Sequence, residues 1–185
     1  RQNQGEFVLS QWLTLSSAGS GSSEDIALDA TVTTDDQASL SVKLVQDRIV
    51  KLLSALPEPF EPLRRGASSN HLSRFVEREC QMALDLLHVI RSDLEASESF
   101  CAGRTRTTNS VRKIIDTLKH EIVPDHWRKY SVSSQVTVTE WVLDFARRVS
   151  QLHQICLSNA PLGQQLVWFG GWFCPEAFLT AARQA

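Results

Sequence analysis

The chain has 185 residues, of which 42% are hydrophobic and 22% are charged, and its formal net charge is −2. This length allows one domain with a buried core, and the composition is typical of a soluble globular protein. The net charge argues against nucleic acid as a partner, because duplex binders carry a clear cationic excess. No apolar run is long enough to span a bilayer, so we expect no membrane partner. Since the sequence starts at Arg1 rather than at Met, we expect it to be an excerpt from a longer protein.

The first 36 residues are expected to form a separate, flexible N-terminal part. Apolar residues at helical spacing predict one short helix within residues 1–15. Residues 16–23 are a Gly/Ser linker by composition, and residues 24–36 are acidic and contain no Lys or Arg. We therefore divide the protein into a linker part, 1–36, and a helical module, 37–185.

The helical module is predicted to begin with a helix that starts at Thr34, where Thr34 and Gln37 have the spacing of a capping box. The apolar stripe of this helix consists of Val45, Ile49, Leu52, Leu53 and Leu56, and Pro57 ends it. Three prolines and a glycine predict a loop over residues 57–70.

The longest predicted helix runs from about residue 70 to 96. Its broad buried face is formed by Leu72, Phe75, Val76, Glu79, Cys80, Ala83, Leu86, Leu87, Ile90 and Leu94. Arg74 and Arg78 are spaced to pair with Glu77 and Glu79. Residues 97–109 are then expected to be a polar connection. Arg104 and Arg106 of this connection form the most cationic patch of the protein together with Arg112 and Lys113 just beyond it.

Two shorter helices are predicted next. The first begins near residue 109 or 110 and ends at about Ile122, with Val111, Ile114, Ile115, Leu118 and Ile122 facing inward. A turn after Pro124 follows, in which Trp127 and Tyr130 are expected to anchor the packing, and then a brief extended segment over residues 132–138. Thr137 and Glu140 repeat the capping-box spacing and open a helix that contains Trp141, Phe145 and Cys156. Residues 159–163 end it.

The stretch from residue 166 to 184 is the most aromatic part of the sequence. Trp168, Phe169, Trp172 and Phe173 surround the pair Gly170-Gly171, and Pro175 suits the first turn of a final helix. Large aromatic side chains bury much area, and glycines let backbones approach closely. We expect this stretch to be a buried anchor against a helix bundle. The predicted fold is all-α, an irregular bundle of about five to six helices with one long helix.

Residues that carry chemistry are few. No phosphate-binding loop, dinucleotide motif, nucleophile elbow or metalloprotease motif is present. His153 and Cys156 lie three residues apart and could share a metal, but no second ligand pair accompanies them. Cys101, on the polar connection, has no evident His or Asp partner. Cys80, Cys101, Cys156 and Cys174 show no CxxC pair and are interpreted as reduced thiols of a cytosolic protein.

We therefore assign no catalytic, cofactor-binding or metal-binding residue, and predict a set of packing and interaction residues. These are Phe75, Trp127, Trp141, Phe145, Trp168, Gly170, Gly171, Trp172, Phe173 and Pro175.

Several segments, in the same order, resemble the C-terminal region of dynein heavy chains of the cytoplasmic type. Residues 170–184 are similar to the family's G-G-L-F-x-P-E-A-[YF]-[IL]-T-A-x-R-Q. Residues 75–79 resemble F-F-E-R-E, and residues 86–94 resemble L-L-x-x-V-R-x-D-L. Residues 124–130 are similar to P-x-x-W-x-x-Y, and residues 137–145 to T-V-x-x-W-V-x-D-F. Trp172 stands where the family commonly has Leu, and residues 1–36 depart from the family pattern.

The resemblance implies a helical module that follows the sixth AAA+ module of a minus-end-directed microtubule motor and packs on the AAA+ ring. The implied role is mechanical and regulatory, and a β-rich subdomain follows the helices in longer members. The implied partners are other AAA+ modules of the same heavy chain and, for the parent motor, microtubules, a second heavy chain and accessory chains. ATP or ADP and Mg²⁺ would bind the parent outside this segment, and the implied location is cytoplasmic and cytoskeletal.

A second hypothesis is a free-standing helical adaptor that binds a partner through the basic patch from Arg104 to Lys113. An enzyme with Cys101 as its nucleophile is a third.

Overall fold

The computed structural model describes residues 34–62, 70–106, 108–130, 136–158 and 162–185, with side chains from residue 41 onward apart from that of Tyr130. These residues contain five α-helices and three short 3₁₀ helices, and no strand occurs among them. The predicted all-α class is therefore confirmed. The expected helix and linker of residues 1–33, the Thr34 cap, the Tyr130 anchor and most of the extended segment lie outside what is described.

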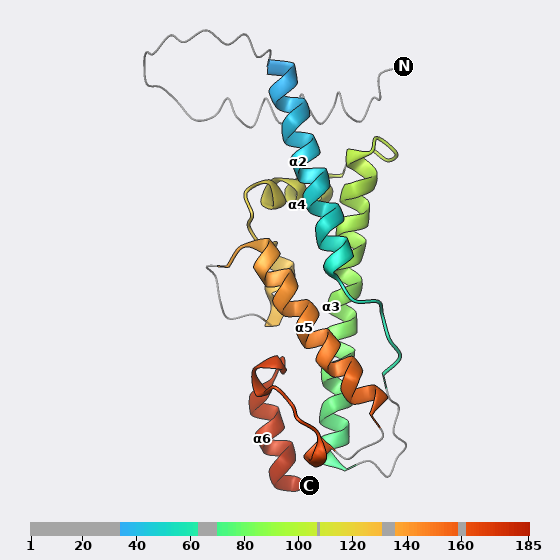
Figure 1. Ribbon diagram of the computed structural model, residues 1–185, viewed down its shortest axis with the longest axis vertical. Helices are drawn as coiled ribbons and strands as arrows, with labels where there is room; N and C mark the ends of the chain where they lie inside the picture. Colours follow the sequence, from blue (N-terminus) through green and yellow to red (C-terminus); the bar gives the residue numbers. More distant parts are fainter. Residues whose placement is uncertain (1–33, 63–69, 107, 131–135, 159–161) are drawn as a thin grey trace, which may run out of the picture.

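The helices form an elongated bundle along one long helix, α3 (His71–Cys101), which contacts α2, α4, α5 and α6 (Figure 1). Helix α2 (Thr34–Ala55) and helix α5 (Val138–Leu157) lie along α3 and also contact each other. Helix α4 (Asn109–Lys119) packs against α2 and α3 at the end where α3 finishes, and α6 (Pro175–Gln184) packs against α3 at its other end. One continuous core runs through this arrangement.

Helix α3 is longer than predicted. The expected polar connection over residues 97–109 is wrong up to Cys101, because Ser97 to Cys101 form the last turns of α3. The Ser97 hydroxyl is fully buried and donates to the Asp93 carbonyl at 2.7 Å, so this polar residue is satisfied within the helix. Phe100 and Cys101 are also buried. At the other end Asn70 caps α3, as its side chain accepts from the Ser73 N–H at 2.9 Å.

Helix α4 ends at Lys119, three residues earlier than predicted, and this places Ile122 outside the core. Glu121 adopts a left-handed backbone conformation with φ 58°, which turns the backbone away from the helix axis. Ile122 is consequently 48% exposed, so the expectation that it faces inward is wrong. Arg48 of α2 donates to the carbonyls of Leu118 and Lys119 and pairs with Glu121 at 2.7 Å. These bonds satisfy carbonyl groups that the helix end leaves free.

Two polar residues of α3 connect it to its neighbours. Arg91 donates to the carbonyls of Leu56 and Pro57, at 3.3 and 2.8 Å, where α2 ends. Asp93 accepts from the indole N–H of Trp127 at 2.7 Å. Trp127 lies in a 3₁₀ helix, η1 (Asp125–Tyr130), and its side chain is fully buried. The carboxylate of Asp93 therefore positions the turn that joins α4 to α5.

Helix α5 begins with the predicted capping box. The Thr137 hydroxyl accepts from the Glu140 N–H, and the Glu140 carboxylate accepts from the Thr137 N–H. The pKa of Glu140 is lowered by these bonds to the backbone and to the hydroxyl of Thr137. Buried residues then recur along the helix: Trp141, Val142, Phe145, Ala146, Val149, Leu152, Ile155 and Cys156.

Trp127→Phe keeps an aromatic ring in the core but removes the hydrogen bond to Asp93. Hydrogen bonds to charged acceptors contribute more than neutral ones, so we expect the free energy of unfolding to fall by about 2 kcal/mol. Urea denaturation of the protein measures the change. Trp168→Phe is the matched control, because this indole is half exposed, and it should cost under about 0.5 kcal/mol. Equal losses for the two variants would contradict a special role for the Asp93 bond.

Candidate functional site

A buried carboxylate holds the aromatic C-terminal segment against α3. Glu79 is 1% exposed, and its two carboxylate oxygens accept from the backbone N–H groups of Phe173 and Cys174, at 2.6 and 3.0 Å. These N–H groups immediately precede α6, whose first helical residue is Pro175. One side chain of α3 thus fixes the start of α6, and we call this arrangement the Glu79 clamp.

Burial and hydrogen bonding shift the pKa of Glu79 in opposite directions. Burial raises the pKa of Glu79 above its ordinary value of 4.5. The two backbone hydrogen bonds lower the pKa again, as do the charges of Arg78 and Arg148, but they do not cancel the effect of burial. The helical pattern of the sequence places Glu79 on the buried face of the helix but predicts neighbouring arginines as its partners. Its main partners lie 94 and 95 residues further along the sequence.

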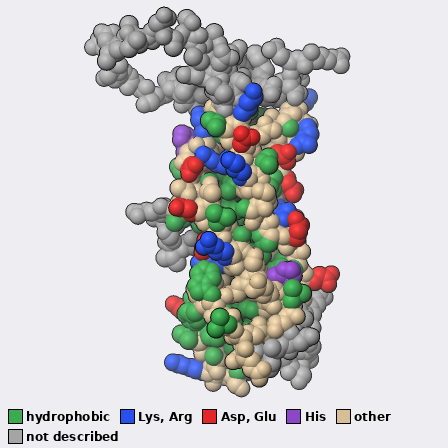
Figure 2. All heavy atoms as spheres, in the orientation of Figure 1, with side chains coloured by type: hydrophobic (Ala, Val, Ile, Leu, Met, Phe, Trp, Pro, Cys, Tyr) green, Lys and Arg blue, Asp and Glu red, His purple; other side chains and the backbone are tan. Residues whose placement is uncertain are grey.

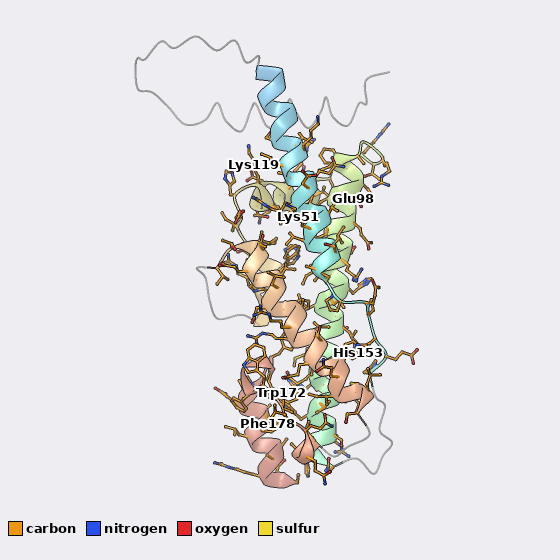
Figure 3. The ribbon with its side chains drawn as sticks, in the orientation of Figure 1. Lys51, Glu98, Lys119, His153, Trp172 and Phe178 are labelled. Atoms are coloured by element: carbon orange, nitrogen blue, oxygen red, sulfur yellow. The ribbon has the colours of Figure 1, made fainter. Side chains whose placement is uncertain are left out.

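Aromatic rings pack around the Glu79 clamp from three elements. Trp172 is 2% exposed and meets the Phe75 ring of α3 edge-on, with centroids 4.9 Å apart. On its other side Trp172 stacks against Phe178 of α6 at 5.6 Å and 17° (Figure 3). Phe173 contacts Phe145, which stacks on Trp141 within α5, and Trp141 in turn stacks on Trp127. Of the second aromatic doublet, Trp172 is thus part of the core, and Phe173 is partly buried against it.

The glycine pair allows the segment to lie close to α5. The Gln151 side chain accepts from the Trp168 N–H at 2.8 Å and donates to the Trp168 carbonyl at 3.1 Å. A Cβ atom on Gly171 would lie 2.6 Å from the Gln151 amide nitrogen, and one on Gly170 would lie 2.9 Å from the Trp168 indole nitrogen. Both contacts are shorter than a Cβ atom allows, so a side chain at either glycine of this turn, η3 (Phe169–Gly171), would require the Gln151 or Trp168 side chain to move.

The first aromatic doublet is not buried. Trp168 and Phe169 are 49% and 47% exposed, so the expectation that the whole stretch is a buried anchor is wrong for this half. Leu166 is fully exposed, and Leu179 on the outer side of α6 is 53% exposed. We call Leu166, Trp168, Phe169 and Leu179 the apolar end surface. Hydrophobic side chains gather over this end of the molecule in Figure 2. Exposed apolar groups of this size in one region are typical of interaction sites.

The other candidates from the sequence do not form a reactive site. Cys101 is not on a loop but in the last turn of α3, where it is 3% exposed. Burial raises its pKa to about 11, and the nearby Glu98 adds to the effect, so the thiolate is disfavoured. His153 stacks on Phe60 at 4.8 Å, and the Cys156 sulfur lies 3.3 Å from that of Cys80. Among the described residues no group of three or more His, Cys, Asp or Glu is placed to hold a metal ion.

Three residues of the predicted basic patch, Arg104, Arg106 and Lys113, are exposed. Arg104 pairs with Glu98 at 3.0 Å, and Lys113 is exposed on α4. Arg112, by contrast, is partly buried. Within the described ranges, no helix is both long and apolar enough to cross a membrane.

Glu79→Ala leaves two buried N–H groups without an acceptor and should lower the free energy of unfolding by about 3 kcal/mol. The pH dependence has a definite sign. Because the pKa is raised in the folded state, the contribution of Glu79 is fully present below its ordinary value of 4.5 and declines as pH rises through the folded-state pKa. The stability advantage of the wild type over Glu79→Gln should therefore shrink from acidic to neutral pH in urea titrations. An advantage that grows with pH would contradict the raised pKa.

Trp172→Leu replaces a buried indole by a smaller aliphatic side chain. The smaller side chain leaves the Phe75 and Phe178 rings without a contact surface, and we expect a loss of about 2 kcal/mol in unfolding free energy. Phe169→Leu, at a half-exposed ring, should cost about 1 kcal/mol or less. Thermal denaturation of both variants provides the comparison. A Trp172→Leu variant as stable as the wild type would show that the packing adjusts to the smaller residue.

Comparison with known proteins finds relatives that are dynein chains of the cytoplasmic and the ciliary type. The cytoplasmic dynein heavy chain of Paramecium tetraurelia is 33% identical over 165 residues, which cover 86% of this protein and 4% of the relative. That of Dictyostelium discoideum is 33% identical over 139 residues, covering 74% of this protein and 3% of the relative. The ciliary dynein beta chain of Tripneustes gratilla is 28% identical over 147 residues, which cover 78% of this protein and 3% of the relative. The sequence therefore spans only 3 to 4% of the length of these relatives.

The structure joins the segments that carry the family resemblance. Glu79 belongs to the segment similar to F-F-E-R-E and binds the aromatic segment, and Asp93 binds Trp127 of the P-x-x-W turn. The family model for the C-terminal domain of dynein heavy chains matches residues 2–185. A free-standing adaptor is not favoured by these matches. The protein belongs to the dynein heavy chain family and is a segment of its C-terminal region.

Proposed function

We propose that this segment is a non-catalytic structural and regulatory element of a dynein heavy chain, which packs against the AAA+ ring of the same heavy chain. The parent would be an ATP-driven, minus-end-directed microtubule motor in the cytoplasm, associated with the cytoskeleton. Its partners would be microtubules, a second heavy chain and accessory chains. ATP or ADP and Mg²⁺ would bind in AAA+ modules outside this segment.

The apolar end surface is the observation that carries this proposal. Its aromatic members are held in place rather than free to fold inward, since Gln151 binds both backbone groups of Trp168 and the Glu79 clamp holds the residues that follow. Phe169 meets Phe178 edge-on at 5.8 Å and keeps 47% of its surface exposed. A rigid apolar surface on a segment of a much longer protein is suited to packing against another part of that protein.

The states of the four cysteines bear on the non-catalytic part of this proposal. All four cysteines are free thiols, and three of them are buried. Burial raises the pKa of Cys101 and of the more accessible Cys174, which disfavours both thiolates. In the basic patch, Arg104 forms an ion pair with Glu98 of the same segment.

Replacing Trp168 and Phe169 together by Ser in the heavy chain that contains this segment should weaken packing on the ring and lower microtubule-stimulated ATPase activity severalfold. The nucleotide sites themselves would remain, so basal ATP binding should change little. Ile122→Ser is the matched control, because Ile122 is also about half exposed but lies on the turn after α4. Unchanged ATPase activity and unchanged protease resistance of the double variant would contradict the proposed packing.

A further inference from the structure

A groove lies between α5 and the segment that leads into the aromatic turn. It has a volume of about 670 Å³. Its lining residues come from α5 and the region just after it, and from residues 165–168: Leu143, Ala146, Arg147, Ser150, Gln151, Gln154, Ile155, Ser158, Gln165, Leu166 and Trp168. The groove adjoins the apolar end surface, with which it shares Leu166 and Trp168.

The α5 wall of the groove has the form of a helix-docking face. Leu143, Arg147, Ser150 and Gln154 recur at steps of four, three and four residues, so they lie on one outward side of the helix. The small side chains of Ala146 and Ser150 lie at its centre and allow a second helix to approach closely. Leu143, at one end of this face, is 45% exposed, as an outward position should be. Such a face, with an exposed apolar side chain at one end and small side chains in the middle, can receive the ridge of an amphipathic helix.

The opposite wall does not offer a strand edge. The N–H and carbonyl of Trp168 are both bound to Gln151, and the Gln165 N–H donates to the Leu162 carbonyl at 3.1 Å. An extended peptide would therefore find few free backbone groups with which to pair. Contact on this side would come from the exposed Leu166 and Trp168 side chains instead.

The charges of the groove indicate the chemistry of its occupant. Arg147 is the one charged residue among the lining residues, and it forms no ion pair with any described residue. Its neighbour Arg148 is engaged, as it pairs with Asp144 at 2.8 Å and donates to the Trp172 carbonyl at 3.2 Å. No carboxylate of the described residues lines the groove. An occupant with a carboxylate opposite Arg147 would thus gain an ion pair without meeting a like charge.

We propose that this groove binds an amphipathic, acid-bearing helix from another part of the same heavy chain. The helix places apolar side chains against Leu143, Leu166 and Trp168 and a carboxylate against Arg147. This inference rests on the proposed packing within the heavy chain and goes further, because it specifies the surface, the secondary structure and the charge of the partner segment.

A photo-crosslinking residue at position 150, in the heavy chain that contains this segment, tests the proposal directly. The expected product, identified by mass spectrometry, is an intramolecular crosslink to a helical peptide with Asp or Glu from outside residues 1–185. Crosslinks to residues 1–33, to a second heavy chain, or to an accessory chain would each overturn the assignment, as would the absence of any crosslink.

The same probe at position 179, on the apolar end surface, separates this proposal from the broader one. Crosslinks from position 179 to the AAA+ ring, without any from position 150, would overturn the groove assignment and leave the packing proposal intact. The absence of crosslinks from both positions would overturn both.

Charge reversal provides a second test. Arg147→Glu should reduce the crosslinking yield from position 150 severalfold, because it places like charges together. Lys113→Glu is the matched control, an exposed cation on α4 that should leave the yield unchanged. Replacing the acidic residue of the crosslinked peptide by Lys should restore the yield in the Arg147→Glu background. Equal yields from wild type and Arg147→Glu would overturn the ion pair.

Discussion

The fold of this segment depends on a carboxylate that is taken out of water. Glu79 lies on the buried side of α3, where an unpaired charge would be strongly unfavourable. It is tolerated because two backbone N–H groups that precede α6 point at its oxygens. The N–H groups of Phe173 and Cys174, at and just before the N-cap of α6, in turn gain a carboxylate acceptor in a partly buried position. Each partner therefore offsets part of the cost of burying the other.

Two other polar residues of α3 also bind groups of neighbouring elements. Arg91 binds the carbonyls at the end of α2, and Asp93 binds the indole of Trp127 before α5. Arg91 thus satisfies carbonyl groups that the end of α2 leaves free, and Asp93 satisfies the indole N–H of a buried side chain. Hydrophobic packing alone tolerates sliding of one helix along another, whereas such directional bonds define one position. Helix α3 therefore determines both the core and the register of the elements around it.

This rigidity explains how the segment can present apolar side chains to the outside. The second aromatic doublet contacts rings of α3, α5 and α6, whereas Trp168 and Phe169 remain about half exposed. The Arg148 guanidinium lies 5.6 Å from the centroid of the Trp168 ring. This protein spans 3 to 4% of its relatives' length, and the proposed packing would make this surface one side of a larger contact.

Local spacing along the sequence predicts the helices of the described residues, the capping box of α5 and most of the buried faces. The capping box of α5, the proline at the start of α6 and the apolar periodicity of α3 act over a few residues, and local spacing reveals them. Three features follow from helix packing and not from local spacing: Glu79 binds residues 94 and 95 positions away, α3 continues to Cys101, and Trp172 is buried while Trp168 and Phe169 are half exposed. Such pairings depend on which surfaces meet once the helices pack. The spacing of residues along the sequence indicates which face of a helix a residue occupies, but not which distant residue it contacts.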